Sequence, residues 1–187
     1  MLETYVKKIL SSKVYDLAKE TPLSPARLLT QRFGTQVYLK REDLQSIFSF
    51  KLRGAYNRMV HIDANQLEKG VVTASAGNHA QGVAVAADKL NVKATVVMGF
   101  NTPAIKVESV KNFGAKVILH GDSYDEAAEF ANNLAESEGS TYIHPYDDPL
   151  VIAGQGTVGM EIANQHTGHI DAIFVPVGGG GLIAGIA

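Results

Sequence analysis

The hydrophobic pattern of this chain alternates between two periods. Short apolar runs, typical of strands buried on both faces, alternate with longer segments whose apolar residues recur at helical spacing. The predicted strands are 37–42, 70–75, 93–99, 115–121, 141–144 and 171–177. The predicted helices are 3–19, 50–61, 76–90, 102–114, 123–139 and 149–168, and Gly139 is expected to cap the fifth of them.

Strands that alternate with helices in this way predict βαβ units. The expected fold class is therefore α/β, a three-layer αβα arrangement with an open parallel sheet. Ligands of such sheets bind beyond the carboxyl ends of the strands. Three stretches with unusual chemistry are expected at those ends, and each is a candidate part of a site.

The first stretch is a run of four glycines, Gly178 to Gly181, after the last predicted strand. Glycines let the backbone approach a ligand closely, and a helix that begins there presents free N–H groups, so the run suits a phosphate. No Gly-Lys-Ser/Thr follows, which excludes a Walker loop, and the spacing does not fit the dinucleotide fingerprint. A flexible turn is an equally good interpretation of the glycines alone.

The second stretch, TASAGNHAQGVA at 73–84, crowds polar residues at a strand-to-helix junction. Ser75, Asn78, His79 and Gln81 are the polar members. Together with the N–H groups of the helix start they suit a carboxylate. Each also has an ordinary explanation, because Ser75 or Asn78 can act as a helix N-cap and a lone histidine is more often structural.

The third stretch, SFKLRG, places Lys51 at the start of a predicted helix. The positive end of the helix dipole disfavours a cation there. A lysine that works as a neutral amine fits this position, since a lowered pKa makes it a nucleophile. For an arbitrary lysine, a solvated surface side chain is the commoner outcome.

The three stretches together suit one kind of cofactor. A phosphate cradle, a carboxylate-binding turn and an amine that can form a Schiff base match a cofactor with both an aldehyde and a phosphate. Pyridoxal 5'-phosphate is such a cofactor, and enzymes bind it through a lysine.

Composition narrows the class of protein. The 187 residues are 45% hydrophobic and 19% charged with a net charge of -2, so neither a nucleic-acid surface nor a membrane surface is expected. There is no cysteine, which excludes disulfides and thiolate metal sites, and the histidines lack metal-ligand spacing, so no metal is expected. No signal peptide or long apolar run is recognisable, and a cytoplasmic protein is expected.

The chain also resembles a known family. Its motifs SFKLRGAYNRM, TASAGNHAQGVA, IKV, VIAGQGTVGMEI and VPVGGGGLIAGIA are similar, in order and spacing, to those of the threonine dehydratases (threonine ammonia-lyases), fold-type II pyridoxal-phosphate enzymes. The segment LKREDLQSIFSFKLRGAYN is closer to the biosynthetic branch, which starts isoleucine synthesis. The resemblance implies a tryptophan synthase β-like fold and the conversion of L-threonine to 2-oxobutanoate and ammonia.

The resemblance implies roles for particular residues. Lys51 would hold the cofactor covalently and remove the α-proton of the substrate, and Phe50 would pack near the cofactor ring. Asn78 would hydrogen-bond the 3-hydroxyl group of that ring. The remaining implied contacts are Ser75, Ala76, Gly77 and His79 for the substrate carboxylate, and Gly178, Gly179, Gly180, Gly181 and Leu182 for the phosphate.

Other polar residues are expected to be mainly structural. The mixed-charge run 40–43 reads as a solvated strand end, which in the family borders the site. Arg53 is expected to form a surface salt bridge, with a phosphate or carboxylate partner as the alternative. Residues 155–157 are expected to pack a helix, with a supporting role behind the site as the alternative.

The family pattern continues beyond residue 187, with further strands of a large domain and a serine expected at the pyridine nitrogen. We therefore expect an N-terminal fragment, with a complete small domain at 41–145 and a partial large domain at 1–40 and 146–187. The predicted strand near 172–177 would then lack sheet neighbours and expose apolar surface.

Three interpretations of function remain. The chain is part of a threonine dehydratase, or of a serine dehydratase or serine racemase, whose substrate differs by one methyl group. Alternatively it is a non-catalytic folding or association module, because its site is half built. The expected partners are a small amino acid, L-threonine or L-serine, and further copies of the chain, as a dimer or tetramer of the parent enzyme.

Overall fold

The structure, a computed structural model, describes residues 2–187. Its helices are α1 (Leu2–Leu10), α2 (Arg27–Phe33), α3 (Lys51–Met59), α4 (Ala64–Leu67), α5 (Asn78–Leu90), α6 (Ala104–Lys111), α7 (Tyr124–Glu138), α8 (Pro149–Gln165) and α9 (Gly181–Ile186). Short 3₁₀ turns are η1 (Val14–Asp16) and η2 (Glu42–Leu44). The strands are β1 (Leu23–Pro25), β2 (Tyr38–Lys40), β3 (Val71–Ala74), β4 (Ala94–Met98), β5 (Lys116–Leu119) and β6 (Thr141–Tyr142).

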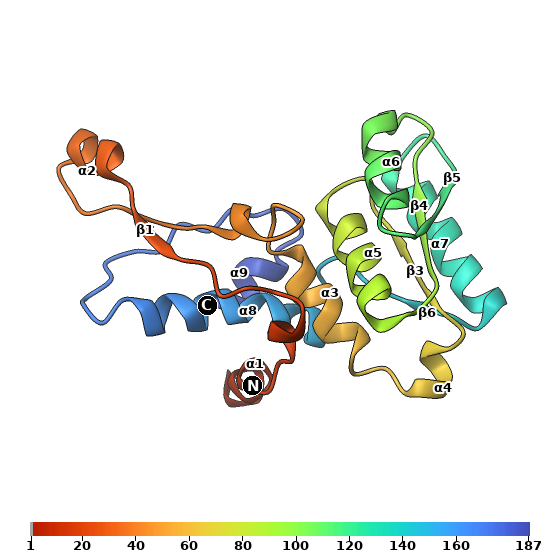
Figure 1. The fold of residues 1–187 in the computed structure, drawn as a ribbon, viewed down its shortest axis with the longest axis horizontal. Coiled ribbons are helices and arrows are strands. Elements are labelled where there is room, and N and C mark those ends of the chain that lie inside the picture. The colour runs from red at the N-terminus through yellow and green to blue at the C-terminus, as the bar shows by residue number, and fades with distance from the viewer. Residues whose placement is uncertain (1) are drawn as a thin grey trace.

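Four parallel strands form an open sheet in the order β5–β4–β3–β6. Helices α5 and α6 cover one face of this sheet and α7 covers the other (Figure 1). The predicted α/β class with three layers is therefore confirmed. The carboxyl ends of β3 and β6 lead directly into residues 75–78 and 143–147, where the candidate site lies.

Alternation along the strands explains how the two faces are filled. Val71 and Val96 belong to the core under α5 and α6, whereas Val72 and Val97 pack against α7. Successive side chains of a strand point to opposite faces, so an apolar run is needed when both faces are covered. This is why the runs near 71 and 96 show no polar alternation.

Helix α3 lies beside the sheet layers and packs against both α5 and α8. Glycines make these approaches possible. A Cβ added to Gly154 of α8 would lie 2.7 Å from the carbonyl oxygen of Arg53, and one added to Gly82 of α5 would lie 3.0 Å from the carbonyl carbon of Lys51. The backbone at Lys51 is therefore held against α5 with no room for a side chain between them.

Two elements, one near each end of the chain, differ in the structure from their predictions. The first helix ends at Leu10 rather than near residue 19, and the hydroxyls of Ser11 and Ser12 bond back to the carbonyl of Lys8. Such side-chain bonds compete with helix continuation. By contrast, Gly139 caps α7 in the left-handed conformation with a φ of 66°, as predicted.

The strand predicted at 171–177 is not formed in the structure. An extended apolar run becomes a strand only when a neighbour pairs with its backbone, and no strand within residues 2–187 does so. Phe174 is 94% exposed, and Ile173 and Val177 are also exposed, which agrees with the expected loss of cover. Similarly, β2 is shorter than predicted and pairs antiparallel with β1 outside the parallel sheet.

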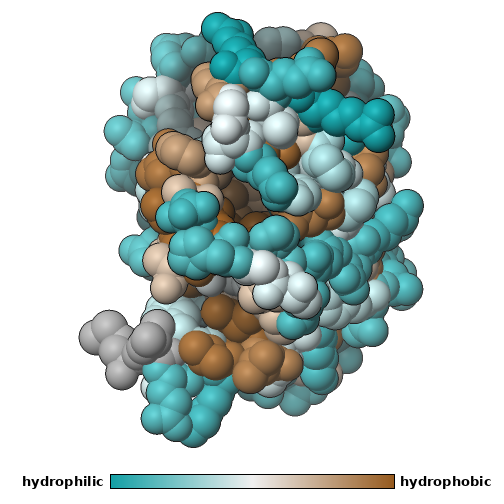
Figure 2. All heavy atoms as spheres, turned by 90° about the vertical axis from the view of Figure 1, so that its left-hand side faces the viewer, coloured by the Kyte–Doolittle hydropathy of each residue, from teal (hydrophilic) through white to brown (hydrophobic). Residues whose placement is uncertain are grey.

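Hydrophobic surface is visible among polar residues on the side of the molecule that carries α2 (Figure 2). Leu28 and Phe33 of α2 are 81% and 62% exposed. None of the helices within residues 2–187 combines the length and apolar character that a membrane span requires.

Gly154→Ala is expected to lower the free energy of unfolding by about 1–3 kcal/mol, because its Cβ meets backbone atoms of α3 that cannot move cheaply. Gly159→Ala, on the same helix, is the matched control. Its Cβ meets Ile186 at 3.3 Å, near the end of α9, so the gain in helix propensity of ~1 kcal/mol offsets most of the crowding. Urea titrations of both variants check this, and equal effects would contradict the close packing of α3 on α8.

Candidate active site

Lys51 is the first residue of α3, as predicted, and its side chain is half-buried. Nζ donates a hydrogen bond of 2.6 Å to the carbonyl of Pro145 and lies 5.6 Å from the centroid of the Phe50 ring. Burial lowers the pKa of Lys51 below its ordinary value. The amine thus has a neutral acceptor and a reduced preference for the charged form.

The segment after β6 connects Lys51 to the sheet. The carbonyl of Ile143 accepts hydrogen bonds from the Thr73 hydroxyl at 2.8 Å and from Nε2 of His79 at 3.1 Å. Two residues later, the carbonyl of Pro145 meets the amine. Strand β3 and helix α5 therefore fix the acceptor that holds Lys51.

The glycine loop packs against the next residue of the same segment, Tyr146. A Cβ at Gly179 would overlap the Tyr146 ring, and one at Gly181 would lie 2.8 Å from the Tyr146 carbonyl oxygen. Gly178 and Gly180 differ, because their Cβ positions meet nothing within 4 Å, and Gly180 has a φ of 89°. Two glycines thus serve packing, and two present backbone toward open space next to the half-buried Leu182.

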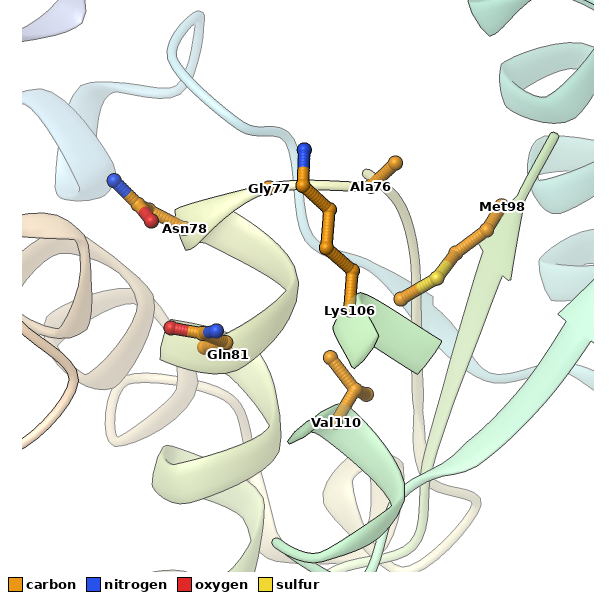
Figure 3. Close-up of a pocket in the computed structure, with 7 residues that line it drawn as sticks. All are labelled: Ala76, Gly77, Asn78, Gln81, Met98, Lys106 and Val110. Carbon is orange, nitrogen blue, oxygen red and sulfur yellow. The ribbon is translucent and has the colours of Figure 1, made fainter. Parts of the chain in front are cut away.

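The turn between β3 and α5 forms the edge of a small hollow of about 90 Å³ (Figure 3). The Ser75 hydroxyl accepts a hydrogen bond of 3.1 Å from the N–H of Gly77, which closes the turn. Figure 3 shows Lys106 of α6 extending alongside this turn. The sequence pattern did not single out Lys106. The remaining lining residues are Ala76, Asn78, Gln81, Met98 and Val110.

His79 occupies a different position from the other predicted members of the turn. Its ring is buried, and because a carbonyl only accepts, Nε2 carries the proton in the bond to Ile143. Burial, and then the charge of Lys51, lower the pKa of His79 to about 3, so the ring stays neutral. Its Nδ1 lacks a hydrogen-bond partner within residues 2–187. Only the backbone of His79 is therefore placed to join the open side of the turn.

Arg53 is fully buried, so the expected surface salt bridge is wrong. Its Nε and Nη2 bond Glu42 at 2.8 and 2.7 Å, and Nη2 bonds Glu161 of α8 at 3.0 Å. Nη1 also meets the Thr157 hydroxyl at 3.0 Å. Arg53 follows the candidate lysine by two residues. Its guanidinium joins α3 to α8 and to the η2 turn.

The charged run 40–43 divides between two environments. Lys40 pairs with buried Glu161 and Glu42 pairs with Arg53, whereas the Arg41–Asp43 pair faces solvent. The expectation of a solvated strand end therefore holds for only half of the run. Strand alternation does not explain this division, because β2 ends at Lys40 and Glu42 begins the η2 turn.

Glu161 remains ionised inside the protein. Burial opposes its ionisation, but hydrogen bonds from Arg53 and Lys40 outweigh burial and lower the pKa of Glu161. The Tyr15 hydroxyl donates to the same carboxylate at 2.8 Å. Burial and this bond raise the pKa of Tyr15 to about 12.

Residues 155–157 pack helices together, as predicted: Gln155 and Thr157 face α3, and Gly156 lies against α9 and α1. Oε1 of Gln155 accepts a bond of 3.2 Å from the N–H of Gly54. The Thr157 hydroxyl donates to the Gly154 carbonyl at 2.6 Å and accepts from Arg53. Both side chains therefore connect α8 to α3, the helix that carries Lys51.

The family model for pyridoxal-phosphate dependent enzymes matches residues 14–187. The chain belongs to this family. The cofactor predicted from the amine, the turn and the glycine loop is therefore confirmed at the level of the family. The comparisons do not assign the roles of individual residues, which remain predictions.

The chain is similar over nearly its whole length to several proteins of this family. The chain is 62% identical over 183 residues to the biosynthetic, chloroplastic threonine dehydratase of Arabidopsis thaliana, covering 98% of this chain and 31% of the relative. The chain thus spans about a third of that relative's length. The processed threonine deaminase isoform 2 of Solanum lycopersicum superposes with a TM-score of 0.96 at 54% identity, over 100% of this chain and 51% of that chain. Maize serine racemase gives a TM-score of 0.92 at 36% identity, covering 99% and 55%.

The residues present fit the cofactor of this family. A half-buried amine with a lowered pKa suits a covalent bond to an aldehyde, and the free backbone at Gly178 and Gly180 suits a phosphate. Phe50 offers an aromatic ring close to the amine. The amine contacts Pro145, and the glycine loop contacts the next residue, Tyr146.

Glu161→Gln is expected to destabilise the fold by roughly 3–5 kcal/mol in urea titrations at pH 7, because it leaves the buried Arg53 and Lys40 charges without their shared carboxylate. Glu108→Gln removes the exposed pair with Lys111 and is expected to cost less than about 1 kcal/mol.

The same measurement has a pH dependence. Since the pKa of Glu161 is lowered in the folded state, its contribution is complete above the ordinary glutamate pKa and is lost as the pH falls through the lowered value. The gap between wild type and Glu161→Gln should therefore shrink with acidification. A gap that is small at pH 7, or that does not change with pH, would contradict an ionised, buried Glu161.

Proposed function

We propose that this chain binds pyridoxal 5'-phosphate through Lys51 and supplies the lysine-bearing part of the active site of a biosynthetic threonine dehydratase. The observation that carries the proposal is the environment of the Lys51 amine. It is half-buried, has a lowered pKa, donates to the Pro145 carbonyl and stands across the 145–146 segment from the glycine loop.

Each side chain then has a task. Nζ of Lys51 forms the covalent bond to the cofactor and, once released by the substrate, accepts the α-proton as a neutral amine. Phe50 packs beside the cofactor ring, and Asn78, at the start of α5, hydrogen-bonds its hydroxyl. Gly178 to Leu182 bind the phosphate. When bound, the cofactor supplies an electron sink for the carbon that loses its proton.

The turn between β3 and α5 is proposed to orient the substrate. Ser75, Ala76 and the backbone of His79 would present donors to the α-carboxylate at the start of a helix, whose dipole favours an anion, and the bond from the Gly77 N–H to the Ser75 hydroxyl would shape the turn. Holding the carboxylate there fixes the α-carbon relative to Nζ of Lys51. Overall, L-threonine gives 2-oxobutanoate and ammonia: the β-hydroxyl leaves as water, and water is taken up again when the nitrogen is released.

Threonine is favoured over serine by similarity to the named relatives. Identity is 62% to a threonine dehydratase but 36% to a serine racemase. Serine turnover is the second candidate, because the superposition on maize serine racemase is nearly as close and one methyl group separates the substrates.

The division of the chain is also a proposal. Residues 41–145 contain the whole parallel sheet and would form the small domain, while 1–40 and 146–187 would belong to a large domain. A homo-oligomer and a cytoplasmic location remain predictions. The plant relative named above is chloroplastic, so the compartment differs among similar proteins.

Incubation of the chain with pyridoxal 5'-phosphate, followed by borohydride reduction and peptide mass spectrometry, is expected to place a reduced phosphopyridoxyl group on Lys51. Lowering the pKa of Lys51 raises its neutral fraction at neutral pH, and the neutral amine is the form that reacts with an aldehyde. Lys51→Ala should lose this adduct, and Lys116→Ala, an exposed lysine of β5, should retain it.

Labelling spread over exposed lysines, or unchanged in Lys51→Ala, would overturn the assignment of Lys51. If Lys51 is labelled, formation of 2-oxobutanoate from threonine and of pyruvate from serine then separates the two substrates. Release of neither product would leave the chain as a cofactor-binding module without turnover.

A further inference from the structure

His144 makes an unusual set of hydrogen bonds. Its Nδ1 accepts from two backbone N–H groups, those of Tyr146 at 3.2 Å and Asp147 at 2.7 Å. Its ring also meets the Tyr146 ring edge-on, with centroids 4.7 Å apart. Two donors on one ring nitrogen require that nitrogen to be unprotonated, so the imidazole must be neutral with its proton on Nε2.

The turn that His144 closes stands between the two halves of the proposed cofactor site. On one side, the Pro145 carbonyl accepts the Lys51 amine. On the other side, the ring and carbonyl of Tyr146 contact the backbone of Gly179 and Gly181 so closely that neither tolerates a Cβ. A change in the turn would therefore move the acceptor of the amine and the support of the glycine loop together.

We propose that His144 is a positioning residue for the proposed cofactor site: its neutral imidazole closes the 144–147 turn, which sets the Pro145 carbonyl against Lys51 and Tyr146 against the glycine loop. This inference rests on the proposed function, because the positioned groups are those proposed to bind the cofactor. The geometry of the 144–147 turn can be tested without any cofactor.

The environment of His144 keeps the ring neutral near pH 7. Burial lowers the pKa of His144 and the Lys51 charge adds to this effect, while Asp147 and Asp148 oppose it. The titratable groups that surround the ring come from every neighbouring element: Lys51 of α3, His79 of α5, Tyr142 of β6, and Tyr146, Asp147 and Asp148 of the same segment.

Protonation of Nδ1 would remove the acceptor of both backbone N–H groups. Because the pKa of His144 is lowered in the folded state, the closed turn is stable at pH values above the ordinary histidine range and weakens as the pH falls below it. Lys51 would then lose its Pro145 acceptor, and the glycine loop its support. The site is thus expected to assemble less well in mild acid for a reason separate from the titration of the amine.

Two variants separate the acceptor from the ring. His144→Asn keeps an acceptor at nearly the position of Nδ1 and does not titrate, whereas His144→Phe keeps an aromatic ring and loses the acceptor. His169→Asn, at an exposed position of the 166–180 segment, is the matched control. All variants are made in the full 187-residue chain.

The first readout is the imidazole ¹⁵N spectrum of the chain without any cofactor. We expect the imidazole signal that is lost in His144→Asn, and is thereby assigned to His144, to show an unprotonated, hydrogen-bonded Nδ1. A His144 protonated on Nδ1 at pH 7.5 would overturn the proposal.

The second readout is the yield of borohydride-trapped Lys51 as a function of pH. At pH 7.5, the yield of trapped Lys51 in His144→Phe is expected to be roughly tenfold lower than in wild type, because two backbone hydrogen bonds are lost. The yield in His144→Asn should equal that of wild type. Below pH 6.5 the wild-type yield should fall more steeply than that of His144→Asn.

Wild-type yields for His144→Phe, or identical pH profiles for wild type and His144→Asn, would refute the positioning role. A loss in both variants without rescue by asparagine would indicate a merely structural residue and would also refute it. Absence of trapping in wild type at every pH would instead refute the proposed function, and the ¹⁵N spectrum would still decide the state of the turn.

Discussion

The buried guanidinium of Arg53 joins parts of the chain that lie far apart in sequence. Through Glu42 it holds the segment that precedes α3, and through Glu161 and Thr157 it holds α8. Buried ion pairs are costly unless their hydrogen bonds are satisfied, and here both carboxylates receive several. Since Arg53 lies two residues after Lys51 in the first turn of α3, this network holds that turn against α8 and the segment before α3.

The same network shapes the electrostatics of the site. Glu42 pairs with Arg53, and the buried Glu161 pairs with both Arg53 and Lys40. The Lys51 amine is left with a carbonyl acceptor, and burial alone shifts its pKa downward. A carboxylate beside Lys51 would do the opposite and favour the ammonium form. The carboxylates that pair with Arg53 are therefore separate from the carbonyl that accepts the Lys51 amine.

Much of the fold follows from local pattern. The runs near 71, 94 and 116 are strands because both faces of the sheet are covered, and α7 ends where Gly139 adopts a left-handed conformation. The strand predicted at 171–177 failed because strand formation depends on a neighbour that no local pattern reveals. The first helix was predicted too long because apolar periodicity continued past Ser11 and Ser12, whose hydroxyls end it.

The parts of the candidate site that depend on residue type were predictable from the sequence. The parts that depend on main-chain hydrogen bonds and long-range contacts were not. A lysine at a helix start, a glycine run and a polar turn are visible in sequence. The burial of Arg53 depends on Glu161, 108 residues away, and the acceptor of Lys51 is a main-chain carbonyl, so neither leaves a side-chain signal. The double acceptor role of His144 is likewise a property of the folded turn.

The most direct test of the account is the pKa of the Lys51 amine in the folded chain. Competitive acetylation at a series of pH values, quantified for each lysine by mass spectrometry, gives this value. We predict that Lys51 titrates clearly below the ordinary lysine value of about 10.4. A pKa equal to or above that ordinary value would contradict the proposed role, because the amine would then be an ordinary cation at the start of α3.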